Sequence, residues 1–402
     1  MSPQNFIFPK GFFWGAATSA HQVEGGNIND WSEWERRNAK IKSQNAKLYP
    51  PAGGWPDYIL KNYPNPLQEE NYISGRACDH YNRFQEDFDI AKSLGHNAHR
   101  FSIEWSRIEP EEGKFNEKEI EHYRKVIRAL KERGMEPFVT LWHWAIPVWF
   151  SEEGGWSSKR SVEYFSRYAG RMVIEFSNVK FWVTLSEANV YSAHGYWQGD
   201  WPPEKHSTIN YLKVNRNLAR AHCKVFTIIK KVIPDAHVGV TQLFIYFSRS
   251  RIKSFAWNHL FLKYINSSLD FIGVDYYFSD RKTSKVSEFL QWSIDPEGLH
   301  HVLRAAARYK KPIYVIENGI ADAQDRSRSE YIRNHIDAVR LSIVTGVDVR
   351  GYFYWSLLDN FEWDKGFWPR FGLVEVDYRT MERKIRTSAY EYKKIIEEGF
   401  EL

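Results

Sequence analysis

Two glutamates follow short apolar runs in this chain of 402 residues, each at the point where a buried strand would end. Glu187 comes after the run 181–185, and Glu317 comes after the run 313–316. Either glutamate alone could be a solvent-exposed cap of its strand. Because barrels of alternating strands and helices place their chemistry at the carboxyl ends of the strands, the two together predict a pair of carboxylates that acts on one bond.

Such a pair suits glycoside hydrolysis, in which one carboxylate attacks the anomeric carbon and a second carboxyl group protonates the leaving oxygen. The pKa values of the two groups must then differ. Arg100 ends another apolar run, and its permanent positive charge would keep a neighbouring carboxylate ionised. A purely structural ion pair would bring Arg100 to the same place, so both interpretations stay open.

Further polar and aromatic residues follow the other apolar runs. Each of them alone is most often structural, as a buried histidine, a core tryptophan or an anchoring tyrosine. A hexopyranose needs hydrogen-bond partners for its hydroxyls and an aromatic plate for its C–H face, and this group supplies both. The predicted sugar-binding residues are Gln22, His143, Trp144, Tyr277, Trp355, Glu362 and Trp363.

Strands must position these residues, and the chain contains eight candidate strands. Between them lie helical patterns, such as the run 120–134, in which apolar residues recur at helical spacing and Gly134 ends the helix. Strands that are apolar on both faces predict a parallel sheet covered by helices, and eight alternations predict a closed (β/α)₈ barrel with the site at the carboxyl ends of its strands. The candidate strands are 12–15, 98–103, 137–142, 181–185, 238–243, 271–274, 313–316 and 350–355.

No linker divides the chain, which predicts one domain over residues 1–402. The one long irregular stretch, 36–78, follows the first strand and contains YPPAGGWP. Connections of this length are usually functional or mobile. Trp55 and the prolines favour an ordered flap over the mouth of the barrel, with a mobile excursion as the alternative.

The composition indicates which classes of partner and which cellular location to expect for the protein. The formal net charge is +5 and the basic residues are scattered, which disfavours a nucleic-acid site. The chain has two cysteines, Cys78 and Cys223, no signal-peptide pattern and no apolar stretch long enough to cross a membrane. We expect a soluble cytoplasmic protein without a nucleic-acid or membrane partner, and the oligomeric state stays open. Without a phosphate loop, HExxH, CxxC or G-x-S-x-G motif, we expect no metal and no cofactor.

Several longer motifs carry a family resemblance over nearly the whole chain. They are FFWGAATSAHQVEGG, HRFSIEWSRIEP, TLWHWAIPVWF, IENGI, and GYFYWSLLDNFEW with RFGLVEVDY after it. With these motifs the chain resembles glycoside hydrolase family 1, the β-glucosidase and β-galactosidase family. The resemblance implies a retaining mechanism with Glu317 as nucleophile and Glu187 as acid and then base. It also implies that Gln22, His143, Glu362 and Trp363 hold sugar hydroxyls, that Trp355 stacks beneath the ring, and that Tyr277 and Arg100 contact the nucleophile.

The sequence departs from the family pattern beside the predicted acid. Ser186 stands where the family has an Asn that binds the sugar 2-hydroxyl, and Ala188 stands where it has Pro. We expect Ser186 to border the substrate. A water or Asn189 would fill the space that the longer Asn side chain leaves, and the sugar 2-hydroxyl would be bound more weakly. Asp275 also replaces a usual Asn, and Ile316 replaces a usual Thr.

The predicted function is therefore hydrolysis of terminal β-D-glucosyl residues, with galactosyl or fucosyl residues as further substrates, in small-molecule β-glycosides or oligosaccharides. The Glu362-Trp363 pair favours neutral sugars, because a carboxylate there would repel a phosphate at C6. One alternative is a degenerate family member that binds sugars without turnover. Another is an enzyme that mainly transfers the sugar to a second sugar or an alcohol.

Overall fold

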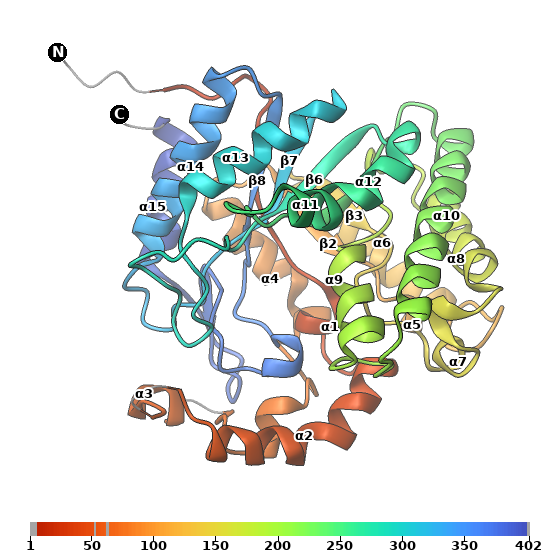
Figure 1. Ribbon diagram of the computed structural model, residues 1–402, viewed down its shortest axis with the longest axis horizontal. Helices are drawn as coiled ribbons and strands as arrows, with labels where there is room; N and C mark the ends of the chain where they lie inside the picture. Colours follow the sequence, from red (N-terminus) through yellow and green to blue (C-terminus); the bar gives the residue numbers. More distant parts are fainter. Residues whose placement is uncertain (1–5, 52–53, 62–63, 400–402) are drawn as a thin grey trace.

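The eight strands close into a parallel barrel in chain order, as predicted (Figure 1). The computed structural model describes residues 6–51, 54–61 and 64–399. The barrel closes where β1 pairs with β8, from Phe13 opposite Gly351 to Ala17 opposite Trp355. The strands are β1 Phe13–Ala17, β2 Ala98–Ser102, β3 Glu136–Thr140, β4 Phe181–Val183, β5 His237–Leu243, β6 Phe271–Asp275, β7 Ile313–Asn318 and β8 Val349–Trp355.

Aromatic side chains fill the interior of the barrel. Phe138 and Phe181 stack with ring centroids 4.2 Å apart, and Phe271, Tyr314 and Phe353 join the same buried cluster. A barrel of eight strands is just wide enough for side chains to fill. The interior of the barrel is therefore filled with side chains, so a ligand that enters the barrel can bind only at one of its ends.

Long helices follow most strands and cover the outside of the barrel. In Figure 1, α14 and α15 lie on one side, and α8 and α10 lie on the opposite side. The longer helices are α4 His80–Ser93, α6 Glu117–Glu132, α8 Ser161–Glu175, α10 Thr208–Val232, α13 Pro296–Ala306, α14 Arg328–Val344 and α15 Thr387–Glu398. Within the described ranges, no helix combines the length and the apolar character needed to cross a membrane.

Shorter elements fill the connections. After β5 the chain forms a short helix, a π-helical turn and a second short helix before it reaches β6. A two-stranded antiparallel hairpin follows β8. These elements are α1 Ala20–Val23, α5 Trp105–Ile108, α7 Val148–Glu152, α9 Ala188–Ser192, α11 Arg251–Ser254, the π turn Phe255–His259, α12 Leu260–Ile265, and the hairpin strands β9 Val374–Val376 and β10 Arg383–Ile385.

The prediction of an irregular stretch over 36–78 is wrong for much of its length. Helix α2, Asp30–Leu48, runs through its first part, and α3, Asp57–Leu60, follows. Asn29 begins α2 with a capping box, in which its side chain accepts from the backbone N–H of Ser32. The polar composition of α2 hid its helical periodicity in the sequence.

The expected position of this segment at the barrel mouth agrees with the contacts of Trp55. Its ring lies 5.3 Å from that of Trp368 and 5.7 Å from that of Phe289. Both of these residues line the cavity that contains Glu187 and Glu317. Residues 52–53 and 62–63 of the predicted flap lie outside the described residues.

Candidate active site

Glu317 lies in β7 and is held by two donors. The guanidinium of Arg100, which is fully buried on β2, donates to one carboxylate oxygen, and the hydroxyl of Tyr277 donates to the other at 2.7 Å. Arg100 itself is fixed by Thr140 Oγ1, which accepts from its Nε at 2.8 Å. These contacts leave the carboxylate of Glu317 in one orientation at the carboxyl end of its strand.

Glu187 lies beyond β4 and begins α9. Its backbone has a φ of 43°, in the left-handed region that non-glycine residues rarely adopt. The backbone N–H donates to the Thr241 carbonyl on the neighbouring strand at 3.0 Å, which helps to hold this conformation. The side chain is 5% exposed, and its Oε1 has no hydrogen-bond partner among the described residues. An unusual backbone conformation that points an unpartnered carboxyl group into a cavity is typical of a functional site.

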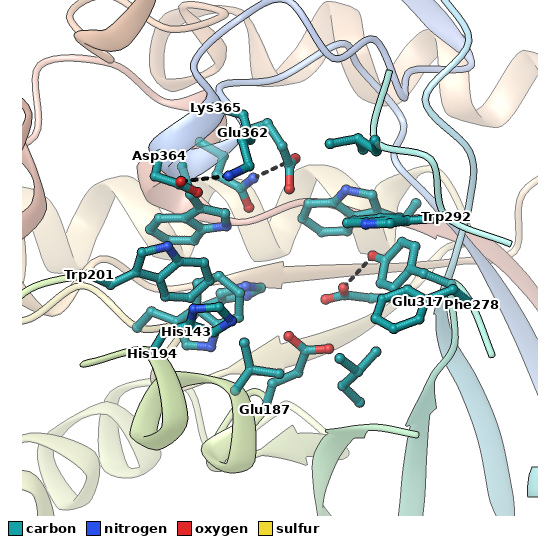
Figure 2. Close-up of a pocket in the computed structure, with 18 of the residues that line it drawn as sticks. His143, Glu187, His194, Trp201, Phe278, Trp292, Glu317, Glu362, Asp364 and Lys365 are labelled. Carbon is teal, nitrogen blue, oxygen red and sulfur yellow. Dashed lines mark hydrogen bonds and ion pairs between the residues drawn. The ribbon is translucent and has the colours of Figure 1, made fainter. Parts of the chain in front are cut away.

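The two glutamates face one another across the cavity (Figure 2). One carboxylate oxygen from each, and one from Asp275, lie within 4.8 Å of one another. Glycosidases that retain configuration hold their two carboxyl groups about 5 to 5.5 Å apart, whereas inverting enzymes leave about 6.5 to 9.5 Å for a water. The observed distance belongs to the shorter class.

Asp275 is the residue of this cluster whose contribution the sequence did not reveal, although its departure from the family pattern was visible. It ends β6, is fully buried, and has no hydrogen-bond partner for either carboxylate oxygen among the described residues. Burial and the charge of Glu317 raise its pKa well above the usual value. Three carboxylates so close could hold a cation, but here the buried guanidinium of Arg100 already supplies a positive charge.

The environments of Glu187 and Glu317 affect the pKa values of the two groups differently. Burial, and then the charges of Asp275 and Glu317, raise the pKa of Glu187 well above its usual value. Burial also raises the pKa of Glu317, but Arg100 and Tyr277 oppose that rise. Glu187 is therefore the group that keeps its proton more readily, and Glu317 is the group with charge-stabilising donors.

Two predicted sugar-binding residues form one hydrogen-bonded unit. Gln22, on α1, donates to Glu362 at 3.3 Å and to the Phe361 carbonyl at 2.9 Å. Asn360 also donates to the Glu362 carboxylate, at 3.1 Å. Burial raises the pKa of Glu362 to about 8. Side chains held in this way present fixed polar groups to a ligand.

Aromatic rings form another part of the cavity wall. His143 stacks on Trp363 with centroids 5.9 Å apart, and Trp144 packs against Trp363 at 4.6 Å. Trp355, at the end of β8, lies 6.1 Å from His143. Burial lowers the pKa of His143 well below its usual value, so the ring is neutral, and its Nδ1 has no partner among the described residues.

Ser186 does not border the cavity. It is fully buried, and its hydroxyl accepts from Arg100 at 2.9 Å and lies 3.2 Å from Thr241 Oγ1. Asn189 does not fill the gap either, because its side chain is turned toward β5 and donates to the Leu243 carbonyl at 3.0 Å. Ser186 therefore contributes through Arg100, and the expected contact of Asn189 with the sugar is wrong.

Apart from Arg100, which is fully buried and contacts Glu317, the remaining predicted residues line one cavity of about 440 Å³, a volume typical of small-molecule sites. Its outer part contains residues that sequence reasoning missed, several of them from the loops after β4 and β6. Two of these residues are Asp364 and Lys365, and Asp364 accepts a hydrogen bond from Lys365 at 2.8 Å. Their position directly after Glu362 and Trp363 was a signal in the sequence that could have identified them. The loop residues carried no signal; they include His194, Asp200, Trp201, Phe278, Phe289, Leu290 and Trp292.

Comparisons with known proteins agree with this arrangement. The sequence model of Glycosyl hydrolase family 1 matches residues 4–246 and 281–400. A 1,4-beta-D-glucan glucohydrolase of Thermotoga neapolitana is 30% identical, and the alignment covers 97% of this chain and 98% of the relative. Beta-glucosidase A of Thermotoga maritima is also 30% identical, with 97% of each chain covered. The segment 247–280, which carries Asp275 and Tyr277, lies outside the family match.

Solved structures show the same fold. A beta-glycosidase from Pyrococcus horikoshii superposes with a TM-score of 0.85 at 35% identity, covering 99% of this chain and 97% of that one. The beta-glucosidase from Thermotoga maritima in complex with deoxynojirimycin superposes with a TM-score of 0.83 at 29% identity, covering 98% and 99%. With nearly all of the chain matched, the predicted barrel and the family resemblance are confirmed. The chain belongs to Glycosyl hydrolase family 1 and is a glycoside hydrolase.

Proposed function

We propose that this chain hydrolyses terminal β-D-glucosyl residues of small-molecule glycosides by covalent double displacement. The observation that carries the proposal is the short distance between Glu187 and Glu317, whose carboxylate oxygens lie within 4.8 Å. A water cannot stand between the two groups and the sugar at that separation, so a protein carboxylate must be the first nucleophile.

In the first step, Glu317 attacks the anomeric carbon while Arg100 and Tyr277 hold its carboxylate in place. The bond from the anomeric carbon to the leaving oxygen breaks, and Glu187 transfers its proton to that oxygen. In the second step a water attacks the glycosyl ester, Glu187 takes the proton of the water, and Glu317 leaves as a carboxylate. The raised pKa of Glu187 suits the donor role, because the group must begin protonated.

The glycon would bind between the polar and the aromatic walls. Gln22 and Glu362, which are hydrogen-bonded to each other, would bind hydroxyl groups of the sugar. The neutral His143 would bind another hydroxyl through a ring nitrogen that has no partner among the described residues, and Trp355 and Trp363 would pack against the sugar ring. Two of the relatives are named as β-glucosidases, and a glucosyl unit is therefore the first choice. Galactosyl and fucosyl units differ from a glucosyl unit at hydroxyl groups that would bind to Gln22 and Glu362, and they are the next candidates. Both cysteines, Cys78 and Cys223, are free, which supports a cytoplasmic enzyme.

Aryl β-glucoside hydrolysis tests this function. We expect the wild type to release both phenol and glucose, with β-glucose as the first product seen by NMR. Release of phenol without glucose would indicate transfer to another acceptor, and α-glucose as the first product would contradict the retaining mechanism. A sugar binder without turnover would release neither product.

Variants at the two glutamates assign the roles. Glu317→Gln should abolish turnover, and Glu187→Ala should lower kcat by about 10² to 10⁴-fold on a glucoside with a poor leaving group, as loss of a general acid does. On an activated aryl glucoside, whose good leaving group departs without acid assistance, breakdown of the glycosyl ester limits Glu187→Ala, and added azide should rescue it by attacking the ester without base assistance. Glu132→Gln, at an exposed residue of α6, is the matched control and should change nothing. Full activity of Glu317→Gln would contradict the assignment.

A further inference from the structure

A second cavity, of about 660 Å³, lies outside the active site between α10 and the connection from β5 to β6. One wall is a stripe of α10 that runs from Tyr211 to Cys223, and the other is a stripe that runs from Ala256 to Tyr264. On both walls the lining residues recur at helical spacing, so each helix turns one whole face to the cavity. We call this cavity the α10 groove.

The walls of the α10 groove are largely apolar, yet they are open to solvent. Leu212 is 59% exposed, Tyr264 is 72% exposed and Leu260 is 37% exposed. The stretch of α10 along the groove is thirteen residues, or about 18 Å at the rise of an α-helix. A groove of this length and volume with largely apolar walls has the dimensions of a small-molecule site and room for an extended alkyl chain.

Two arginines stand at this groove without an acidic partner. Arg216 and Arg220 are exposed, line the groove one helical turn apart, and form no ion pair with the described residues. Like charges at this spacing repel one another. An anion bound between them would relieve that repulsion.

The surrounding sequence adds to the positive potential. Residues 205–234 contain seven Lys or Arg and no Asp or Glu, and residues 247–269 contain four and none. The two ranges form the two walls of the groove. In a chain with a net charge of only +5, basic residues are concentrated here.

One wall of the groove lies outside the match to the family's sequence model. The wall from Ala256 to Tyr264 belongs to the segment 247–280 that the family match leaves out. The π-helical turn Phe255–His259 forms part of the same wall, and such turns occur frequently at functional sites.

We propose that the α10 groove binds a single-chain anionic amphiphile of the fatty-acid class. Its alkyl chain would lie between α10 and α12, and its carboxylate would bind Arg216 and Arg220. A second copy of this chain fits less well, because a two-fold interface would place the same basic segments against each other. A sugar or a nucleotide would leave its polar groups unpaired against the apolar walls.

Calorimetric titration with monomeric laurate tests the proposal. We expect wild-type protein to bind laurate, and to bind neither acetate, which lacks the chain, nor dodecyltrimethylammonium, which has the opposite charge. The double variant Arg216→Glu/Arg220→Glu should bind laurate at least tenfold more weakly and should gain affinity for dodecyltrimethylammonium. Lys213→Glu/Lys224→Glu changes the net charge equally at exposed positions of α10 outside the groove lining, and it should keep wild-type affinity.

Cysteine chemistry locates the bound chain. Cys223 lines the groove, whereas Cys78 is fully buried and its thiol donates to the Asp359 carbonyl. Laurate should slow the reaction of Cys223 with a water-soluble thiol reagent. Ala219→Trp, which fills the groove, should abolish both the binding and the protection.

Three results would overturn the proposal. Equal weakening in the two charge variants would indicate a diffuse charge effect. Laurate binding that leaves Cys223 unprotected would place the ligand elsewhere. A wild-type dimer that Ala219→Trp converts to a monomer would show that a second copy occupies the groove. The charge variants alter exposed side chains only, so they test the proposal even if Ala219→Trp does not fold.

Discussion

The protonation of Glu187 depends on its neighbours more than on its own chemistry. Burial disfavours its charged form, and the carboxyl groups of Asp275 and Glu317 disfavour it further. In its proposed role as general acid, Glu187 must hold its proton before the first step, so these neighbours should extend the active form of the enzyme to higher pH.

Asp275→Asn should move the alkaline limb of the kcat/KM profile to lower pH. Asparagine has nearly the same shape as aspartate, but it carries no negative charge and can donate to Glu187, and both changes lower the pKa of Glu187. The pH profile on an aryl β-glucoside measures the shift. Thermal stability at neutral pH should rise, because a folded-state pKa above the unfolded value costs stability once the pH exceeds the unfolded value.

Asp235→Asn is the control for this variant, since Asp235 is exposed and distant from the cavity lining. Its profile should match that of the wild type. An unchanged alkaline limb in Asp275→Asn would show that the charge of Asp275 does not reach Glu187.

At the scale of elements, the loop after β8 carries Glu362 and Trp363 and is anchored by one buried carboxylate. Asp359 accepts from Arg386 through both of its oxygens at 2.8 Å and from the Gly372 backbone at 2.9 Å. Although Asp359 is buried, Arg386 and Arg370 hold its pKa below the usual value. The loop after β8 is thereby tied to the hairpin of β9 and β10 and to the start of α15.

Asp359→Asn should lower the free energy of unfolding by about 3 to 5 kcal/mol, since it leaves buried guanidinium groups without their counter-charge. Unfolding by guanidinium chloride measures this loss. The loss should shrink in acid, because a lowered folded-state pKa contributes stability above the unfolded pKa that disappears as the pH falls through the folded value. The KM for a glucoside should also rise, as Glu362 loses its fixed position.

Asp348→Asn provides the comparison for that loop variant. Its ion pair with Arg350 is about half exposed, and pairs of this kind contribute about 0 to 1 kcal/mol. If Asp359→Asn were as stable as Asp348→Asn, the loop would have to be held by other contacts.

At the scale of the whole molecule, the last helix secures the closure of the barrel. The hydroxyl of Tyr392, on α15, lies 3.0 Å from the Gly15 carbonyl on β1 and 3.0 Å from the Tyr352 carbonyl on β8. These are the two strands that meet when the barrel closes. Closure in turn sets the distance between the ends of β4 and β7, and therefore the distance between the carboxylates of Glu187 and Glu317.

Tyr392→Phe should lower the free energy of unfolding by about 1 kcal/mol, the usual contribution of one hydrogen bond. Tyr390→Phe, at a residue that is 53% exposed, should leave it unchanged. Denaturant titration of the two variants in parallel measures the difference. A larger loss for Tyr390→Phe would refute this role for Tyr392.

The sequence by itself determined the barrel, the family and most of the residues of the site. Strand runs, helix periodicity and strand-end residues are local patterns, and the eight strands were recognised to within a few residues of their ends. Glu187, Glu317 and most of the other residues predicted for the site line one cavity, and they could be predicted because parallel strands carry their end residues to one face. Helix α2 was missed, because its polar residues show little periodicity.

Only the tertiary structure decided which side chains touch. Ser186 binds Arg100 instead of bordering the cavity, and Asp275 joins the two glutamates in one cluster. The α10 groove likewise arises where two helices distant in sequence lie side by side. Such contacts depend on barrel closure and on the packing of side chains from separate strands, and residue order does not encode these in any local pattern.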